Sequence, residues 1–262
     1  MRADVFLVEG GHAATRSQAQ RLIAAGVQWR LASSLPWNRV AKNGDDIPAG
    51  AELQLLDAAE AKYLSRGGLK LEGALAAAGI EVAGLRCLDV GQSTGGFTDC
   101  LLQHGAAQVV GVDVGQGQLH PRLRADARVR CIEQVNARAL NASDLVAAGP
   151  YGASAGGQFD PKFGLIVGDL SFISLTLVLP ALVPLLAEGG ALLMLVKPQF
   201  ELQPGQVGKG GIVRDPALYA VVEQRIRARC SALGLQVQAW IDSPIAGGDG
   251  NHEFFVFARR SA

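Results

Sequence analysis

The hydrophobic pattern of the chain changes near residue 60. Beyond that point, short apolar runs alternate with segments in which apolar residues recur every three or four positions, the spacing of one helix face. Strands that alternate with helices indicate a mostly parallel, doubly wound α/β sheet. The runs at 235–244 and 253–260 read as two antiparallel edge strands that close the sheet. The other predicted strands are 85–91, 108–115, a short one within 129–140, 163–172 and 191–200, and the predicted helices are 67–79, 95–106, 175–187 and 215–234.

Residues 1–60 carry a different pattern. A compact helix is predicted from a cap at Ser17 to a stop at Gly26, and the segments after it alternate like short strands between turn signals. We therefore expect a small helical hairpin that leads into a few strands in residues 1–60, and a second domain in residues 61–262. The Gly- and Ala-rich segment 147–162 is expected to be a surface loop without chemistry of its own.

The composition is that of an ordinary globular protein, and its charges narrow the possible functions. Of the 262 residues, 49% are hydrophobic and 18% are charged, and 24 basic residues balance 24 acidic ones. No overall positive field points to nucleic acid, so such binding must come from local patches. Four widely spaced cysteines without a CxxC pair favour free thiols and a cytoplasmic location. The polar first residues and the lack of a long apolar run lead us to expect no signal peptide and no membrane insertion.

The strongest chemical signal is the segment LDVGQSTGGFTDCLL at residues 88–102. A predicted strand ends at Asp89, a loop with three glycines follows, and a helix begins, so backbone N–H groups can approach a ligand closely. Asp113 ends the next strand, where its carboxylate can accept hydrogen bonds from a ribose diol. The spacing matches neither G-x-G-x-x-G nor the G-K-[ST] of a phosphate loop. Acids at two adjacent strand ends around a glycine loop favour S-adenosylmethionine, and the alternative is a structural turn with a capping acid.

Further polar residues follow the later strands of the predicted sheet. Ligands of such sheets bind beyond the carboxyl ends of the strands. Glu133 and Asn136 follow the third strand, Asp169 ends the fourth and Lys197 ends the fifth. Asp169 alone could be a capping acid, and Lys197 alone could reach solvent. As opposite charges on neighbouring strand ends, however, they need each other or a substrate. Pro198 is expected to keep residue 197 extended.

Together, six motifs resemble the TlyA family, whose members are named both as hemolysins and as rRNA 2′-O-methyltransferases and are related to the FtsJ ribose methyltransferases. The resemblance runs from about residue 2 to 257, and the N-terminal segment is similar to an S4 RNA-binding domain. It implies a Rossmann-like S-adenosylmethionine-dependent methyltransferase sheet with a small α+β S4-like domain. Two departures stand out: Gln92 replaces a small residue, which we expect to bear on cofactor affinity, and residues 29–44 differ from a usual basic turn. The motifs are SRGGLKL (65–71), CLDVGQSTGGFTDCLL (87–102), VGDLSFISL (167–175), LVKPQFE (195–201), GKGGIVRD (208–215) and GNHEFF (250–255).

The resemblance implies a catalytic tetrad of two lysines and two acids at Lys70, Asp169, Lys197 and Glu253. A ribose 2′-hydroxyl is a weak nucleophile, so a neutral amine that accepts its proton promotes attack on the sulfonium methyl group. Lys197 is implied as this proton acceptor and Lys70 as the residue that orients the hydroxyl. Asp169 and Glu253 would hold the lysines, and much of the rate would come from alignment.

The resemblance also assigns the ligand contacts. No metal ligand pattern occurs, so we expect no metal. Arginines that could contact RNA phosphates are Arg2, Arg16, Arg21 and Arg66, and for each of them a solvated face is the alternative. The partners implied are ribosomal RNA or ribosomal subunits. The cofactor contacts implied are Asp89, Gly91, Ser93, Thr94, Gly95, Gly96, Phe97, Asp113, Glu133 and Asn136.

Three other functions stay open from the sequence. A membrane-active hemolysin is disfavoured by the lack of a spanning segment or a strongly basic amphipathic helix. A non-catalytic RNA-binding or ribosome-assembly protein is disfavoured by the intact tetrad. Methyl transfer to a base or small molecule is disfavoured because GDLSF at residues 168–172 is not the Asn/Asp-Pro-Pro-aromatic run typical of such sites.

Overall fold

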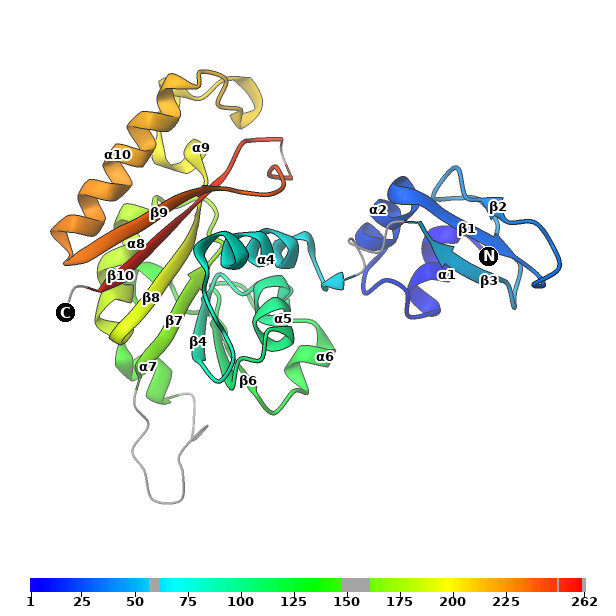
Figure 1. The fold of residues 1–262 in the computed structure, drawn as a ribbon, viewed down its shortest axis with the longest axis horizontal. Helices are drawn as coiled ribbons and strands as arrows, with labels where there is room; N and C mark the ends of the chain where they lie inside the picture. The colour runs from blue at the N-terminus through cyan, green and yellow to red at the C-terminus, as the bar shows by residue number, and fades with distance from the viewer. Residues whose placement is uncertain (57–61, 148–160, 249, 261–262) are drawn as a thin grey trace. The chain divides into compact units, whose positions relative to one another are not determined.

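The computed structural model describes residues 1–56, 62–147, 161–248 and 250–260 (Figure 1). The chain divides into two compact units, Met1–Leu69 and Lys70–Ala262. The division falls inside one helix, α4 (Arg66–Ala78). The predicted domain boundary near residue 60 lies outside the described residues. The predicted surface loop at 147–162 also falls almost entirely outside them.

The first unit packs two helices against a small antiparallel sheet. The strand order is β2-β1-β3, and the apolar side chains between sheet and helices include Leu7, Leu22, Val27 and Ile47. The cap of the second helix is Thr15 and not Ser17, because Thr15 has extended backbone and its hydroxyl accepts a hydrogen bond from the Gln18 backbone N–H, whereas Ser17 already lies within the helix. The elements are α1 (Ala3–Glu9), α2 (Arg16–Gly26), β1 (Val27–Arg30), β2 (Asn38–Arg39) and β3 (Glu52–Leu55).

The second unit is built on a seven-stranded sheet of order β6-β5-β4-β7-β8-β10-β9. Strands β6, β5, β4, β7 and β8 are parallel, and β10 is antiparallel to both of its neighbours, β8 and β9. Of the two strands predicted to lie at the edge, only β9 does so. β10 is internal because its residues 254–258 are apolar and buried on both faces. The strands are β4 (Arg86–Val90), β5 (Gln108–Val112), β6 (Val129–Ile132), β7 (Phe163–Gly168), β8 (Leu186–Val196), β9 (Leu235–Asp242) and β10 (Phe254–Arg260).

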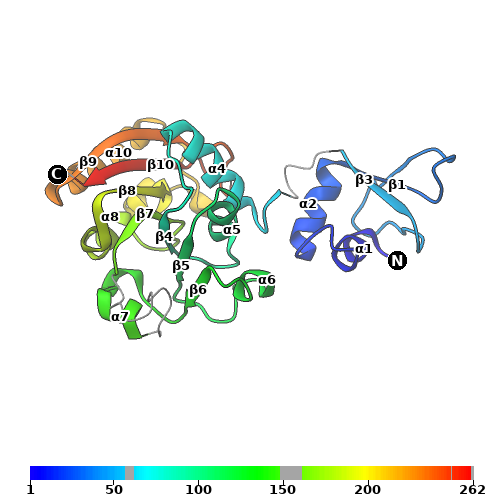
Figure 2. The same ribbon diagram turned by 60° about the horizontal axis from the view of Figure 1, so that its bottom comes forward.

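Helices cover both faces of this sheet, with α4 and α5 on one face and α8 and α10 on the other (Figures 1 and 2). The larger described core cluster joins alternate residues of the strands to apolar residues of α8 and α10, among them Leu179 and Ile226. On the opposite face, the ring of Phe97 in α5 stacks on Phe255 of β10. The remaining helices are α5 (Gly96–Gln103), α6 (Pro121–Arg124), α7 (Ala142–Ala147), α8 (Leu175–Leu182), α9 (Pro198–Glu201) and α10 (Ala217–Ala232), with short 3₁₀ turns at Ala137–Ala139, Val183–Leu185, Pro204–Gln206 and Lys209–Gly211.

This architecture brings the ends of four parallel strands to one edge. β4, β5, β7 and β8 end at Val90, Val112, Gly168 and Val196, and the loops that leave these residues carry most of the polar residues singled out from the sequence. The doubly wound sheet predicted from the alternation of strands and helices is confirmed.

Candidate active site

The loop between β4 and α5 runs against the end of β7. Gly91 and Gly95 have φ of 85° and 97°, and Ser93 has φ of 48°, so the loop uses left-handed backbone three times. A Cβ atom on Gly91 would lie 2.6 Å from the carbonyl oxygen of Asp169. Only glycine fits this position, because both the backbone angle and the close approach exclude a side chain.

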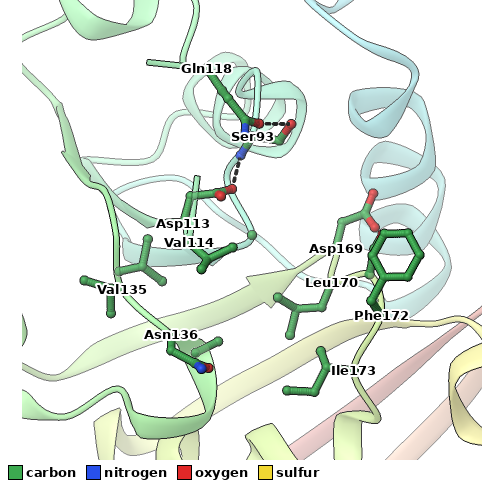
Figure 3. Close-up of a pocket in the computed structure, with 14 residues that line it drawn as sticks. Ser93, Asp113, Val114, Gln118, Val135, Asn136, Asp169, Leu170, Phe172 and Ile173 are labelled. Carbon is green, nitrogen blue, oxygen red and sulfur yellow. Dashed lines mark hydrogen bonds between the residues drawn. The ribbon is translucent and has the colours of Figure 1, made fainter. Parts of the chain in front are cut away.

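Asp113 organises this loop from the neighbouring strand end. Its Oδ2 accepts a hydrogen bond from the backbone N–H of Ser93 at 2.7 Å, and its Oδ1 accepts one from Gly115 at 2.7 Å. The hydroxyl of Ser93 donates to Gln118 Oε1 at 3.2 Å (Figure 3). The carboxylate is therefore fixed at the end of β5, beside the loop.

A cavity of about 470 Å³ opens beside this loop. Its volume falls within the range of sites for small molecules and cofactors. Residues on two opposite sides line it, with Asp113, Val135 and Asn136 on one side and Asp169, Leu170, Phe172 and Ile173 on the other (Figure 3). The lining residues are Gly91, Ser93, Val112, Asp113, Val114, Gln118, Val135, Asn136, Ala137, Asp169, Leu170, Ser171, Phe172 and Ile173.

Four of the ten predicted cofactor residues line this cavity: Gly91, Ser93, Asp113 and Asn136. The structure gives other surroundings to most of the rest. Glu133 accepts hydrogen bonds from Arg124, at 2.5 Å, and from the backbone of Gly117, and the ion pair with Arg124 holds the pKa of Glu133 below its usual range. The residues outside the lining are Asp89, Thr94, Gly95, Gly96, Phe97 and Glu133.

Gln92 turns away from the cavity. Its buried side chain lies over Gly111 of β5, where a Cβ atom would come within 2.0 Å of the Gln92 amide carbon. Its Nε2 donates to the hydroxyl of Thr98 at 2.9 Å, and Thr98 donates to Asp89 Oδ2 at 2.7 Å. The sequence predicted that Gln92 would bear on cofactor affinity, but it is not among the lining residues and its side chain fills space in the sheet.

Asp89 lies at the inner end of this hydrogen-bond chain. It is fully buried, and its Oδ1 has no hydrogen-bond partner among the described residues. Burial raises the pKa of Asp89 to about 7, because removal from water disfavours the charged form more than the Thr98 hydroxyl stabilises it. Asp89 therefore contacts helix α5 and is not among the residues that line the cavity.

Lys197 and Asp169 form an ion pair at the ends of β8 and β7. Lys197 Nζ lies 2.5 Å from Asp169 Oδ1, with the two side chains 13% and 27% exposed. Lys197 Nζ also donates to the hydroxyl of Ser171 at 3.0 Å. The backbone of Lys197 is extended, as Pro198 predicted. The strand predicted to run to residue 200 is shorter, because β8 ends at Val196 and helix α9 begins at Pro198. The ammonium is thus held at the wall of the cavity that Asp169 and Ser171 line.

Lys70 and Glu253 form a second, more deeply buried pair. Lys70 Nζ in α4 donates to Glu253 Oε2 at 2.5 Å, and the side chains are 8% and 2% exposed. Phe254 pairs with Val196 in the antiparallel ladder, so Glu253 and Lys197 occupy the next positions on adjacent strands. The structure therefore brings the four residues of the implied tetrad to one end of the sheet as two lysine–carboxylate pairs.

Sequence reasoning identified Asp169 but missed the other lining residues on that side of the cavity, Leu170 to Ile173. Ser171 and Phe172 lie in the loop after β7, and Phe172 is 91% exposed with φ of 63°. Its ring contacts Phe200 of α9, with the ring centroids 5.1 Å apart. The available signal was position, because these residues directly follow Asp169 at a strand end. Val114, Gln118 and Val135 follow strand ends in the same way.

The arginines predicted to contact RNA lie in the first unit. Arg2 and Arg16 share the buried carboxylate of Asp4, at 3.1 and 2.6 Å, yet their side chains stay 54% and 60% exposed. The two arginines hold the pKa of Asp4 well below its usual range. Arg21 donates to the backbone carbonyl of Ser17. Arg66 is the first residue of α4 and is half-buried.

Two structural features concern metal ions and membranes. Within residues 1–56, 62–147, 161–248 and 250–260, no group of three His, Cys, Asp or Glu side chains could hold a metal ion. No helix in the same ranges is long and apolar enough to cross a membrane.

Comparison with known proteins decides the family. The model of the FtsJ-like methyltransferase family matches residues 63–260. The 16S/23S rRNA (cytidine-2′-O)-methyltransferase TlyA of Mycobacterium tuberculosis is 45% identical over 98% of this chain and 89% of its own length. The chain is a member of the TlyA family of FtsJ-like methyltransferases.

Other members of the TlyA family carry a different name. Hemolysin A of Brachyspira hyodysenteriae is 37% identical over 98% of both chains. The solved structure of a candidate hemolysin from Streptococcus thermophilus is 39% identical, has a TM-score of 0.73 and covers 100% of this chain and 88% of its own. TlyA-family proteins are S-adenosylmethionine-dependent methyltransferases, and the fold described above is the Rossmann-like sheet of that class.

The cavity fits this cofactor in size and chemistry. S-adenosylmethionine combines a nucleoside with a charged sulfonium and an amino acid, and the lining offers apolar walls from Val114, Val135 and Leu170 with carboxylates at Asp113 and Asp169. Carboxylates suit both a ribose diol and positive charge.

Proposed function

We propose that this protein methylates the 2′-hydroxyl of a cytidine ribose in ribosomal RNA, with Lys197 as the proton acceptor. The observation that carries the proposal is the fixed position of Lys197 Nζ, held by Asp169 and Ser171 at the wall of the cofactor-sized cavity. The names of relatives support the substrate, since the relative from M. tuberculosis is a cytidine-2′-O-methyltransferase of 16S and 23S rRNA. Such a substrate would place the enzyme in the cytoplasm.

Bound S-adenosylmethionine supplies an electrophilic methyl group on a positively charged sulfur. The chain's residues align the attacking hydroxyl with that methyl group and remove its proton. In its neutral form the Lys197 amine accepts the hydroxyl proton, while Asp169 and Ser171 keep Nζ in place. Lys70 of α4, held by Glu253 beside the start of β10, is assigned to orienting the hydroxyl. Holding both groups in line supplies much of the rate.

Lys197 suits the role of proton acceptor better than Lys70. Lys70 is tied to a carboxylate that is 2% exposed, and neither residue lines the cavity. Lys197 is not among the lining residues either, but its partners Asp169 and Ser171 are, and Asp169 is 27% exposed. A nucleotide that enters from solvent can therefore approach the Lys197 pair more directly.

Phe172 offers a surface for the target base. A fully exposed aromatic ring is costly in water, and this one rests on Phe200 beside the cavity. Single-stranded or flipped bases are held by stacking on such rings. We assign the ring of Phe172 to stacking with the methylated nucleotide.

The first unit is proposed as an S4-like RNA-binding domain. Two helices on a small antiparallel sheet and the exposed arginine pair on Asp4 support this role. Arg2 and Arg16 each keep N–H groups for a phosphate while Asp4 fixes their orientation. Arg21 and Arg66 are included as further phosphate contacts.

Transfer of labelled methyl groups to ribosomal subunits from a strain that lacks the gene tests the proposal. We expect 2′-O-methylation at discrete cytidines, and we expect Lys197→Ala to abolish transfer while cofactor affinity stays within about threefold. The matched control is Lys162→Ala, an exposed lysine just before β7 that should keep full activity. Leakage of lipid vesicles without RNA methylation would instead favour the hemolysin function.

A further inference from the structure

A buried carboxylate outside the proposed tetrad lies one turn beyond Lys197. Glu201 ends helix α9 and is 4% exposed. Its two carboxylate oxygens accept hydrogen bonds from the hydroxyl of Ser174 at 2.6 Å and from the backbone N–H of Leu175 at 2.6 Å. Burial raises the pKa of Glu201 above its usual value. A carboxyl group is costly to bury, so these two acceptor bonds account for its presence.

The two bonds attach α9 to the start of helix α8. Ser174 is the N-cap of α8, and its side chain accepts a hydrogen bond from Thr176 N at 3.2 Å. The N–H of Leu175 belongs to the first turn, where it has no partner within the helix. A negative charge at this end of a helix is also favourable. Glu201 therefore fixes where α8 begins, and with it the end of the loop that leaves β7.

That loop, residues 169–174, is held by the turn at residues 197–201 at three successive points. Lys197 forms an ion pair with Asp169 and donates a hydrogen bond to Ser171, the ring of Phe200 contacts Phe172, and Glu201 accepts a hydrogen bond from Ser174 at the far end of the loop. The loop's first five residues line the cofactor cavity (Figure 3). The first two contacts belong to the proposed chemistry, and the third one touches neither the cavity nor the reacting groups.

Helix α10 supports the same junction from behind. Arg225 donates to the backbone carbonyl of Glu201, and Arg229, one turn later, donates to the carbonyl of Thr176 at 3.1 Å. One helix thus contacts both α9 and the first turn of α8. Arg225 of α10 therefore fixes the backbone of Glu201, and the carboxylate of Glu201 in turn holds the end of the loop at Ser174.

We propose that Glu201 is a positioning residue that sets the placement of loop 169–174 against the cofactor cavity. Its removal weakens cofactor binding through Leu170 to Ile173 without touching the reacting atoms. The inference rests on the proposed function only for its turnover readout, because cofactor binding can be measured without RNA.

The test compares Glu201→Leu, which cannot accept either hydrogen bond, with Glu201→Gln, which keeps one acceptor oxygen and the shape of the side chain. Isothermal titration with S-adenosylmethionine should show about tenfold weaker binding for Glu201→Leu and a change below about threefold for Glu201→Gln. The activity of Glu201→Leu, expressed as a fraction of wild-type activity, should be higher at saturating S-adenosylmethionine than at low S-adenosylmethionine. The same measurements on Val222→Ala, which opens a cavity in the packed face of α10, should show lower thermal stability with unchanged cofactor affinity.

Cofactor affinity of Glu201→Leu equal to wild type at a temperature where both are folded would overturn the inference. If Glu201→Leu does not fold, Ser174→Ala decides, because it removes one of the two bonds and leaves the carboxylate. We expect about threefold weaker binding for Ser174→Ala, and an unchanged affinity would refute the role. Wild-type protein that binds no S-adenosylmethionine would refute the proposed function instead, so the two failures are distinguishable.

Discussion

Replacing Lys70 with methionine removes the charge that faces Glu253 across 2.5 Å, in a place where the two side chains are 8% and 2% exposed. The glutamate would remain as a buried charge without its partner, which costs about 3–5 kcal/mol. In a unit of this size, 1 kcal/mol shifts the melting temperature by about 2–4 °C, so Lys70→Met should lower it by roughly 6–20 °C.

The double variant Lys70→Met/Glu253→Leu removes both charges and replaces them with apolar side chains of similar volume. Its stability should return to within about 1 kcal/mol of wild type, because replacing a whole buried ion pair is often neutral. Both variants should be inactive, since the double variant restores packing but not the chemistry. The pair would thus be retained for catalysis at no net gain in stability.

Urea unfolding followed by Trp240 fluorescence measures these differences. Trp240 stacks on Phe254, the residue after Glu253, so it reports on this part of the second unit. Trp29 and Trp37 belong to the first unit and should be replaced with phenylalanine in all variants. A loss below about 1 kcal/mol for Lys70→Met, or a double variant as unstable as the single one, would refute the reasoning.

Four further outcomes are expected. Burial keeps Asp89 protonated up to about pH 7, whereas the unfolded chain releases this proton near pH 4. The contribution of the protonated Asp89 to the free energy of unfolding is therefore complete below about pH 4 and is lost as pH rises through about 7. Asp89→Asn should flatten that decline in urea unfolding between pH 4 and 8. Gly91→Ala should lower the melting temperature and cofactor affinity, whereas Gly84→Ala, also at positive φ but in open space, should lose only the smaller strain energy and bind cofactor normally. Phe172→Ala should reduce kcat/KM for RNA at saturating cofactor by about tenfold, the loss of one stacked base. Arg16→Ala should reduce the dependence of log K for RNA on log salt by roughly 0.7–0.9 without lowering cofactor affinity.

The sequence predicted which residues lie at the carboxyl ends of the strands better than it predicted the conformation of the loops that follow them. Asp113, Asp169 and Lys197 could be placed together because parallel strands end at one edge whatever their side chains do. Glu133 satisfied the same rule but bonds Arg124, since strand position does not say which way a long side chain turns.

Loop conformation was out of reach from the sequence for a different reason. Phe172 adopts left-handed backbone that an aromatic residue rarely takes, and its position follows from contacts with residues 197–201. Glu201 is a similar case, because nothing local distinguishes a buried acid from a solvated one. The internal place of β10 did have a signal, since the apolar run FFVFA at 254–258 lacks the alternation of an exposed strand.

The order of strands in the sheet differs from the order in which they are synthesised. β9 leaves the ribosome before β10, yet β10 lies between β8 and β9 in the sheet. Until β10 is made, β9 has no strand to pair with and the long apolar strand β8 keeps an open edge. Glu253 arrives with β10, so the buried charge of Lys70 acquires its partner at the same step. A nascent chain therefore cannot assemble the proposed catalytic groups early, and the unpaired edge of β8 is where we expect chaperones to bind during synthesis.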